Sequence, residues 1–211
     1  MNVIIFGPPG AGKGTQATNI VKKFNLYQVS TGDLLRNELK KDTELSKQIK
    51  SIMDAGKLVS DNIIYSLIEK KLSDKEIKNK IIFDGFPRNL DQVSKLELML
   101  QKHDQKLSKV LNLKVDYSIL IKRLSGRISC SICKKTYNEF FDPPPTNCCQ
   151  KNEFIKRSDD NEETVSKRLK TYDNETLPIL EFYKKQNKVV DIDAMKQITE
   201  VRKEIRGIIT S

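Results

Sequence analysis

The sequence predicts an α/β fold, in which a doubly wound, five-stranded parallel sheet carries helices on its faces. Short apolar runs at 3–6, 27–30, 81–84, 110–115 and 188–192 have the length and content of buried strands. Helical patterns separate these runs, and this alternation is typical of a parallel sheet with right-handed crossovers. A glycine-rich turn follows the first run, and a helical pattern begins directly after it, at Lys13.

That turn has the composition of a phosphate-binding loop. Gly7 and Lys13 are separated by the spacing GxxxxGK. Backbone N–H groups of such a turn, together with the positive end of the next helix dipole, favour bound phosphate, and Lys13 is placed to reach the outer phosphates of a nucleoside triphosphate. Gly14 stands where general phosphate-loop enzymes carry a Ser or Thr, and Thr15 comes one position later. A glycine-rich turn without a ligand is the alternative, which the flanking strand and helix disfavour.

The composition indicates a globular chain whose 211 residues suit one compact domain with small insertions. The net charge is +10, but the lysines occur as short scattered pairs, so a solvated surface is favoured over a nucleic-acid interface. No signal-peptide pattern and no long apolar run is present. We therefore expect a cytoplasmic monomer with no nucleic-acid or membrane partner, with a mitochondrial matrix location left open.

Polar residues follow the second predicted strand. Ser30 or Thr31 is expected to cap the next helix, and Arg36, one turn on, could clamp a monophosphate. Further helical patterns end near Gly56, which suits a helix C-terminus. Ser60 or Asp61 is then expected to cap the helix that follows.

The third predicted strand ends in an acidic residue, Asp84. A carboxylate at this position is the usual companion of a phosphate loop and holds Mg²⁺ directly or through water. Arg88 follows where the chain leaves the carboxyl end of the strand, the edge at which parallel sheets bind ligands. Gln92 offers an amide that can read an adenine edge with both of its ends.

Four motifs together resemble the adenylate kinase family. They are GPPGAGKGT, STGDLLR, DAGKLV and DGFPR, and the resemblance extends from residue 2 to the last helix. It implies reversible phosphoryl transfer from Mg²⁺-bound ATP to AMP, giving two ADP. It also divides the chain into a P-loop kinase core (1–29, 60–126 and 162–211), a mobile AMP-binding insertion (30–59) and a lid insertion (127–161).

The resemblance also assigns contacts by position. The implied AMP contacts are Thr31, Arg36, Lys57, Leu58, Val59, Gly85, Arg88, Gln92, Arg157 and Arg168. The implied donor-nucleotide contacts are Gly10, Ala11, Gly12, Lys13, Gly14, Thr15, Arg123, Arg127, Thr136, Tyr137 and Lys196. The implied catalytic residues are Lys13, Arg88, Arg123, Arg157 and Arg168, with Asp84 holding Mg²⁺ through water.

Two acidic residues lie between the last two of those arginines in the sequence. Asp159 and Asp160 are expected to hold Arg157 and Arg168 by charge-assisted hydrogen bonds, to cap the helix that begins near Asn161, or to do both.

All four cysteines fall within the lid range. Cys130 and Cys133 form a CxxC knuckle, which is half of a zinc site. Cys148 and Cys149 are adjacent, whereas zinc-bearing lids of the family usually carry a second spaced pair. Two interpretations stay open: a tetrahedral zinc site closed by the four thiolates, or structural thiols without a metal.

The donor base is expected to be adenine. Adenine-preferring members of the family commonly carry a stacking His near the position of Asn138, and the Tyr137-Asn138 pair resembles a branch that uses GTP with AMP. Against this, donor sites of the family read the base largely through backbone contacts, so ATP stays the expected donor, with a GTP:AMP phosphotransferase as the alternative. A UMP or CMP kinase and a non-enzymatic nucleotide-binding regulator are the remaining alternatives.

Overall fold

A computed structural model of the chain describes residues 1–41, 43–133, 135–149 and 153–210. Residue 42 of the predicted AMP-binding insertion, residues 134 and 150–152 of the predicted lid, and residue 211 lie outside the described residues.

The described residues form the predicted five-stranded parallel sheet, in the order β2-β3-β1-β4-β8. Its strands are β1 (Asn2–Phe6), β2 (Tyr27–Ser30), β3 (Ile81–Asp84), β4 (Leu107–Lys114) and β8 (Val189–Asp193). β4 begins earlier than the predicted run, because Leu107 is buried and pairs with Asn2 across a register shift. β1 lies at the centre, so the glycine-rich turn that follows it opens in the middle of the carboxyl edge.

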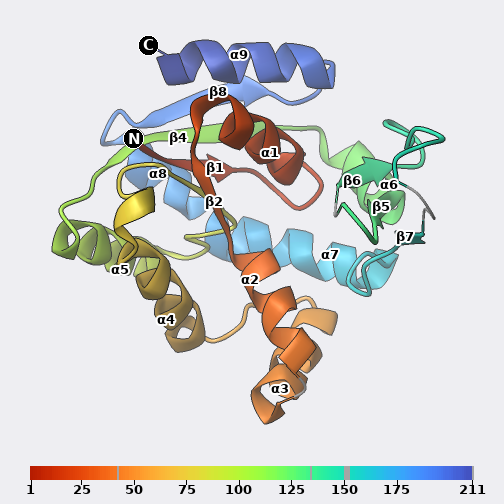
Figure 1. Ribbon diagram of the computed structural model, residues 1–211, viewed down its shortest axis with the longest axis horizontal. Helices are drawn as coiled ribbons and strands as arrows, with labels where there is room; N and C mark the ends of the chain where they lie inside the picture. Colours follow the sequence, from red (N-terminus) through yellow and green to blue (C-terminus); the bar gives the residue numbers. More distant parts are fainter. Residues whose placement is uncertain (42, 134, 150–152, 211) are drawn as a thin grey trace.

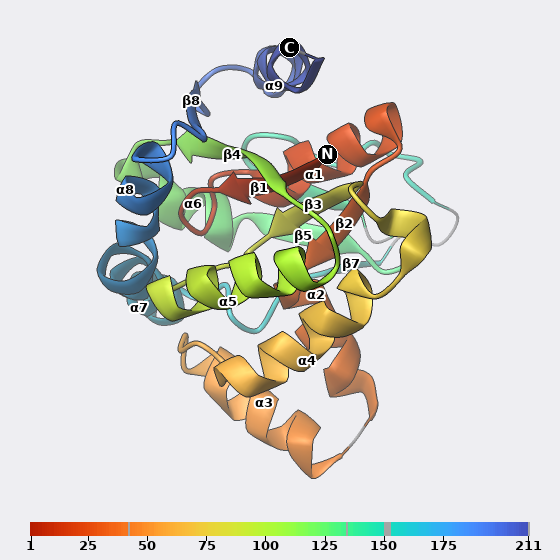
Figure 2. The same ribbon diagram turned by 90° about the vertical axis from the view of Figure 1, so that its left-hand side faces the viewer.

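Helices cover both faces of this sheet (Figures 1 and 2). They are α1 (Lys13–Phe24), α4 (Asp61–Leu72), α5 (Leu90–Lys102), α6 (Leu120–Ser125), α7 (Glu162–Thr171), α8 (Pro178–Lys184) and α9 (Ile198–Thr210). Residues Tyr172–Thr176 form a π-helical turn between α7 and α8. None of the helices in the described ranges is long and apolar enough to cross a membrane.

Alternate side chains of the central strand point into two separate hydrophobic cores. Val3 and Ile5 pack in the core formed with α1 and α9. Ile4 and Phe6 pack in the larger core, which includes residues of α4, α5 and α8. Because both faces of β1 are apolar, only its carboxyl end is available for polar chemistry.

Two segments project from the sheet (Figure 1). The first contains α2 (Thr31–Glu38), a 3₁₀ turn (Leu39–Lys41) and α3 (Glu44–Asp54). The second carries an antiparallel sheet that, among the described residues, has three strands: β5 (Arg127–Cys130), β6 (Thr136–Asn138) and β7 (Phe154–Ile155). Their positions fall within the ranges expected for the AMP-binding insertion and the lid.

The helix caps agree with the sequence only in part. Ser30 caps α2 by accepting a hydrogen bond from the Asp33 N–H, so Thr31 remains available for another contact. The predicted cap of α4 is wrong: within the described residues, Ser60 makes no side-chain capping bond. The Asp61 carboxylate instead accepts a bond from the Gln92 amide, at 2.6 Å, because the buried amide needs a partner.

A buried amide joins three parts of the core at the amino edge of the sheet. The Asn2 side chain donates to Gln105 Oε1 at 3.0 Å and accepts from the Ile81 N–H at 3.1 Å. Gln105 lies before β4, so this contact connects β1, β3 and β4 at the edge opposite the cavity.

We expect Asn2→Ala to lower the free energy of unfolding by about 1–3 kcal/mol, because it leaves the buried Ile81 N–H without its acceptor. Urea unfolding measures the change. Ser108→Ala, at an exposed position of β4, is the matched control and should change stability by less than about 0.5 kcal/mol. Equal stability of the two variants would contradict a structural role for the Asn2 contact.

Candidate active site

A cavity of about 1840 Å³ lies at the carboxyl edge of the parallel sheet. It extends from the turn after β1 to the α2–α3 segment on one side and to the three-stranded sheet on the other. A second, small pocket shares several of its lining residues. Every nucleotide contact implied by the sequence resemblance lines one of these two spaces, although the contacts come from distant parts of the chain.

The turn after β1 presents the start of a helix to the cavity. Gly12 is the residue before α1. Its backbone is left-handed, with φ +91°, and this conformation favours glycine. Within the described residues no side chain caps α1, so the first N–H groups of that helix are available to an anion. The Lys13 ammonium bends back and donates to the carbonyls of Gly7, at 2.7 Å, and Pro8, at 3.0 Å.

Lys13 and Asp84 form the half-buried charged centre of the site. Burial lowers the pKa of Lys13 to about 8, while Asp84 acts in the opposite direction. Lys13 therefore stays mainly protonated at neutral pH and loses its charge as the pH rises through 8. Burial raises the pKa of Asp84, and Lys13 opposes that effect. Gln28, from β2, donates to Asp84 Oδ2 at 3.0 Å and orients the carboxylate.

The surroundings of Asp84 suit a hydrated magnesium ion. A Cβ placed on Gly14 would lie 3.7 Å from Asp84 Oδ2, so the missing Ser or Thr side chain leaves room at this position. The donor at this position is a carboxylate, which suits an ion that keeps most of its water ligands.

The small pocket lies between β3 and the α2–α3 segment, and its lining includes Thr31, Leu58, Val59, Gly85, Arg88 and Gln92. The Thr31 hydroxyl donates to the Gly85 carbonyl at 2.7 Å, and Arg88 Nε donates to the same oxygen at 2.7 Å. Burial lowers the pKa of Arg88 to about 10, so its guanidinium remains charged at neutral pH. This pocket is an apolar slot with a cation at one end.

Gln92 uses both ends of its amide within the protein. Its Oε1 accepts from the Arg88 N–H at 2.7 Å, and its Nε2 donates to Asp61 at 2.6 Å. The sequence predicted an amide that reads a base edge. In this structure the amide fixes the backbone of Arg88 at the wall of the small pocket, and its contact with a base stays a prediction.

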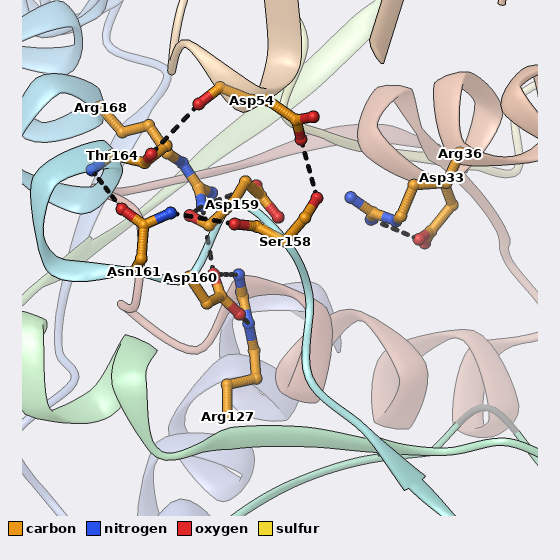
Figure 3. A network of polar contacts seen from close by, with 10 residues as sticks. All are labelled: Asp33, Arg36, Asp54, Arg127, Ser158, Asp159, Asp160, Asn161, Thr164 and Arg168. Atoms are coloured by element: carbon orange, nitrogen blue, oxygen red, sulfur yellow. Dashed lines mark hydrogen bonds and ion pairs between the residues drawn. The ribbon is translucent and has the colours of Figure 1, made fainter. Parts of the chain in front are cut away.

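An arginine–aspartate network closes the lid side of the cavity (Figure 3). Asp160 receives two hydrogen bonds from Arg127, one of them from Nε at 2.6 Å. Arg168 pairs with Asp159 Oδ2 at 2.8 Å and with Asp160 Oδ1 at 3.3 Å. Figure 3 shows the two carboxylates between Arg127 and Arg168.

This network corrects the sequence-based expectation in two respects. Asp159 and Asp160 hold Arg168, as expected, but the second arginine that they hold is Arg127 and not Arg157. Arg157 precedes the two aspartates on the same turn. Within the described residues, the Arg157 guanidinium has no hydrogen-bonded partner, and burial lowers its pKa to about 10. The cap of α7 comes from Asn161, which accepts from the Thr164 N–H at 2.9 Å.

The same segment contacts the end of the α2–α3 segment. The Ser158 hydroxyl donates to Asp54 Oδ1 at 2.8 Å, and the Thr164 hydroxyl donates to the Asp54 carbonyl at 3.1 Å (Figure 3). The two projecting parts of the molecule are thus joined next to the cavity.

The far end of the cavity is formed by α6, by the loop after β8 and by the turn at residues 139–142, directly after β6. We call this turn the first lid turn. Arg123 Nη2 donates to the Ala194 carbonyl at 3.2 Å, and the Arg123 guanidinium lies 5.9 Å from the centre of the Phe141 ring. Thr136, Tyr137 and Lys196 also line this end, and Lys196 forms an ion pair with Glu204 at 2.9 Å.

The four cysteines come together at one end of the three-stranded sheet. Their sulfur atoms all lie within 4.8 Å of one another, and Cys133 Sγ is 3.6 Å from Cys148 Sγ. A tetrahedral zinc ion with Zn–S bonds of about 2.3 Å places its sulfurs roughly 3.8 Å apart, so the cluster fits this ion. Backbone N–H groups of Cys133 and Ile132 lower the pKa of the Cys130 thiol to about 7, which favours the thiolate.

Two residues of the site were missed in the sequence. Gln28 holds Asp84, and the sequence signal was a lone amide in an otherwise half-buried strand. Phe141 lies beside Arg123, and no local pattern identified it, because its contact depends on a lid turn folding back onto α6.

Comparisons with known proteins agree with this geometry. A family model described as adenylate kinase matches residues 5–188. An adenylate kinase of Clostridioides difficile (strain 630) is 44% identical over 97% of this chain and 96% of the relative. One of Pelagibacter ubique (strain HTCC1062) is 42% identical over 99% of each chain, and one of Listeria monocytogenes serotype 4b (strain CLIP80459) is 41% identical over all of both. With its phosphate loop, its cationic cavity and this full-length similarity, the chain belongs to the adenylate kinase family.

Proposed function

We propose that the protein transfers the terminal phosphoryl group of Mg²⁺-bound ATP to AMP, giving two ADP in a reversible reaction. The observation that carries this proposal is a large cavity that is lined by the phosphate loop and by several arginines and lies next to a small pocket with which it shares lining residues. A single drug-sized ligand needs about 300–1,000 Å³, so the cavity can hold two nucleotides.

The proposed chemistry needs no general base. An oxygen of the AMP phosphate is already anionic; it attacks the terminal phosphorus of the donor, and the bond to the bridging oxygen breaks, so that ADP leaves with that electron pair. The protein positions the two phosphates and neutralises their charge. Lys13, Arg88, Arg123, Arg157 and Arg168 are the proposed catalytic residues.

Magnesium, when bound with the donor, supplies positive charge at the phosphate oxygens. Asp84 would hold it through water, and Gln28 would keep the carboxylate turned toward the ion. The space next to Gly14 supports this arrangement.

The two projecting segments have separate proposed tasks. Residues 30–59 form the AMP-binding insertion and residues 127–161 form the lid, while the remaining ranges form the core. Closure of both over the cavity would exclude water, which otherwise competes with AMP as the phosphoryl acceptor. The contact of Asp54 with Ser158 supports a coupled closure, because it joins the two segments directly, while the contact with Thr164 joins the AMP-binding insertion to the core helix α7.

We further propose that the lid binds one zinc ion through Cys130, Cys133, Cys148 and Cys149. None of these cysteines forms a disulfide in the part of the chain that the structure describes, which suits a reducing cytoplasm. Because all proposed site residues come from one chain, the enzyme should act as a monomer.

ATP is the proposed donor, and GTP is the second candidate. Asn138 does not favour GTP by reading its base, because its side chain is bonded to the Arg123 carbonyl and to two backbone N–H groups. A UMP or CMP kinase would need a different acceptor slot, and a regulator without activity would not need such a concentration of cations.

Lys13→Ala should lower kcat by at least roughly a hundredfold, because the ammonium stabilises charge on the transferred group. Steady-state kinetics with ATP and AMP measure the loss, and circular dichroism verifies the fold. Lys23→Ala, in the last turn of the same helix, is the matched control and should leave kcat within twofold of wild type. A folded Lys13 variant with wild-type kcat would remove this residue from the mechanism.

Metal analysis of protein purified without chelator should find close to one zinc per chain. Chelation should lower the melting temperature of the lid before that of the core, and added zinc should restore it. The Cys133→Ser variant should lose the metal, and the melting temperature of its lid should be lowered even without chelator. Protein that contains no zinc would favour structural thiols instead.

Acceptor and donor panels test the assigned reaction. In a coupled assay of ADP formation, we expect AMP to be the preferred acceptor over UMP and CMP, and ATP the preferred donor with saturating AMP. A kcat/KM for GTP tenfold or more above that for ATP would overturn the donor assignment while leaving the acceptor and the arginine roles in place. Absence of transfer with every pair would support a regulator.

A further inference from the structure

We propose that Asn138 is a positioning residue of the donor site, which acts on the donor base through Arg123 and Phe141. The inference rests on the proposed function, because it presumes a nucleoside triphosphate with its base at the α6 end of the cavity. It assigns to Asn138 a role different from direct contact with the base.

The Asn138 side chain connects two structural elements. Its amide nitrogen donates to the Arg123 carbonyl at 2.7 Å. Its amide oxygen accepts from the backbone N–H groups of Phe140, at 2.9 Å, and Phe141, at 3.1 Å. One end thus bonds the C-terminal part of α6, whose last carbonyls lack helical partners, and the other end shapes the first lid turn.

The lid turn lies tightly against the end of α6. The Glu139 N–H donates to the Gly126 carbonyl at 2.8 Å. A Cβ added to Gly126 would lie 2.5 Å from the Phe140 ring, so the ring occupies the space that a side chain would need. Since Phe140 covers this junction, its neighbour Phe141 is turned toward the cavity, which it lines.

The result is a pair of flat groups at the donor end. The Arg123 guanidinium lies 5.9 Å from the centre of the Phe141 ring, and its Nη2 donates to the Ala194 carbonyl at 3.2 Å. Phe141 is 48% exposed, and the Lys122 ammonium also lies over its ring, 5.8 Å from the centre. Guanidinium and aromatic planes are groups on which a purine base stacks.

Two of the cations that would hold the phosphates have their side-chain partners outside this turn, although the backbone of Arg127 pairs with Asn138 in the three-stranded sheet. Lys13 follows the phosphate loop, and Arg127 is held by Asp160 in the segment before α7. Loss of the Asn138 contacts should therefore weaken base binding selectively and leave phosphate binding intact.

The test compares ATP with inorganic tripolyphosphate, which has the phosphates but no base. Asn138→Ala should raise the KM for ATP roughly tenfold, with the KM for AMP within twofold and the inhibition constant of tripolyphosphate against ATP unchanged. Asn138→Ser retains an acceptor for the turn but cannot reach the Arg123 carbonyl, so its KM for ATP should also rise. Phe141→Leu should have a similar effect, and combining it with Asn138→Ala should give less than the product of the two changes.

Glu139→Ala is the matched control, because this side chain lies in the same turn, is exposed and pairs only with Lys156 among the described residues. It should retain the wild-type KM for ATP. Equal weakening of ATP and tripolyphosphate by Asn138→Ala would mean that Asn138 supports the lid as a whole, and an unchanged KM for ATP would remove it from the donor site; either result overturns the proposal. Wild-type protein without AMP-dependent ADP formation would instead overturn the proposed function.

Discussion

The concentration of positive charge around one cavity is the constraint on which the rest of the site depends. Burial lowers the pKa of Arg88, Arg157 and Arg168, and repulsion from neighbouring arginines lowers it further. Such repulsion opposes folding unless anions offset it. Asp159 and Asp160 are those anions within the protein, and the phosphates of two nucleotides would be the others. The arrangement is therefore matched to an anionic substrate pair.

The position of these carboxylates in the chain places contacts with several parts of the molecule on one short segment. The two residues lie between the lid sheet and α7, directly after Ser158, which bonds Asp54 at the end of the α2–α3 segment. One short segment thus orients two arginines, begins a core helix and contacts the opposite insertion. A nucleotide that moves Arg127 or Arg168 would act on both insertions, because the same backbone carries all three contacts.

The site shows where sequence reasoning reaches its limit. The phosphate loop was predicted in detail because its glycines, lysine and flanking elements are contiguous, and local geometry follows from them. Of the two predicted partners of the Asp159–Asp160 pair, Arg168 is confirmed, but Arg127 stands in place of Arg157, since Arg127 lies far away in the sequence and only the fold brings it near. For Gln92 and Asn138 the residue type indicated hydrogen bonding, and the structure adds partners within the protein that the sequence did not show.

The sequence by itself determined the five strands of the parallel sheet, the order of helices between them and the chemical types available at the carboxyl edge. These features follow from apolar periodicity and glycine spacing, which are properties of short segments. The tertiary structure decided which arginine each aspartate holds, that adjacent Cys148 and Cys149 both reach the cluster of thiols, and that the first lid turn lies against α6. These outcomes depend on contacts between distant segments, whose energies are set by packing and charge in the folded chain and cannot be read from neighbouring residues.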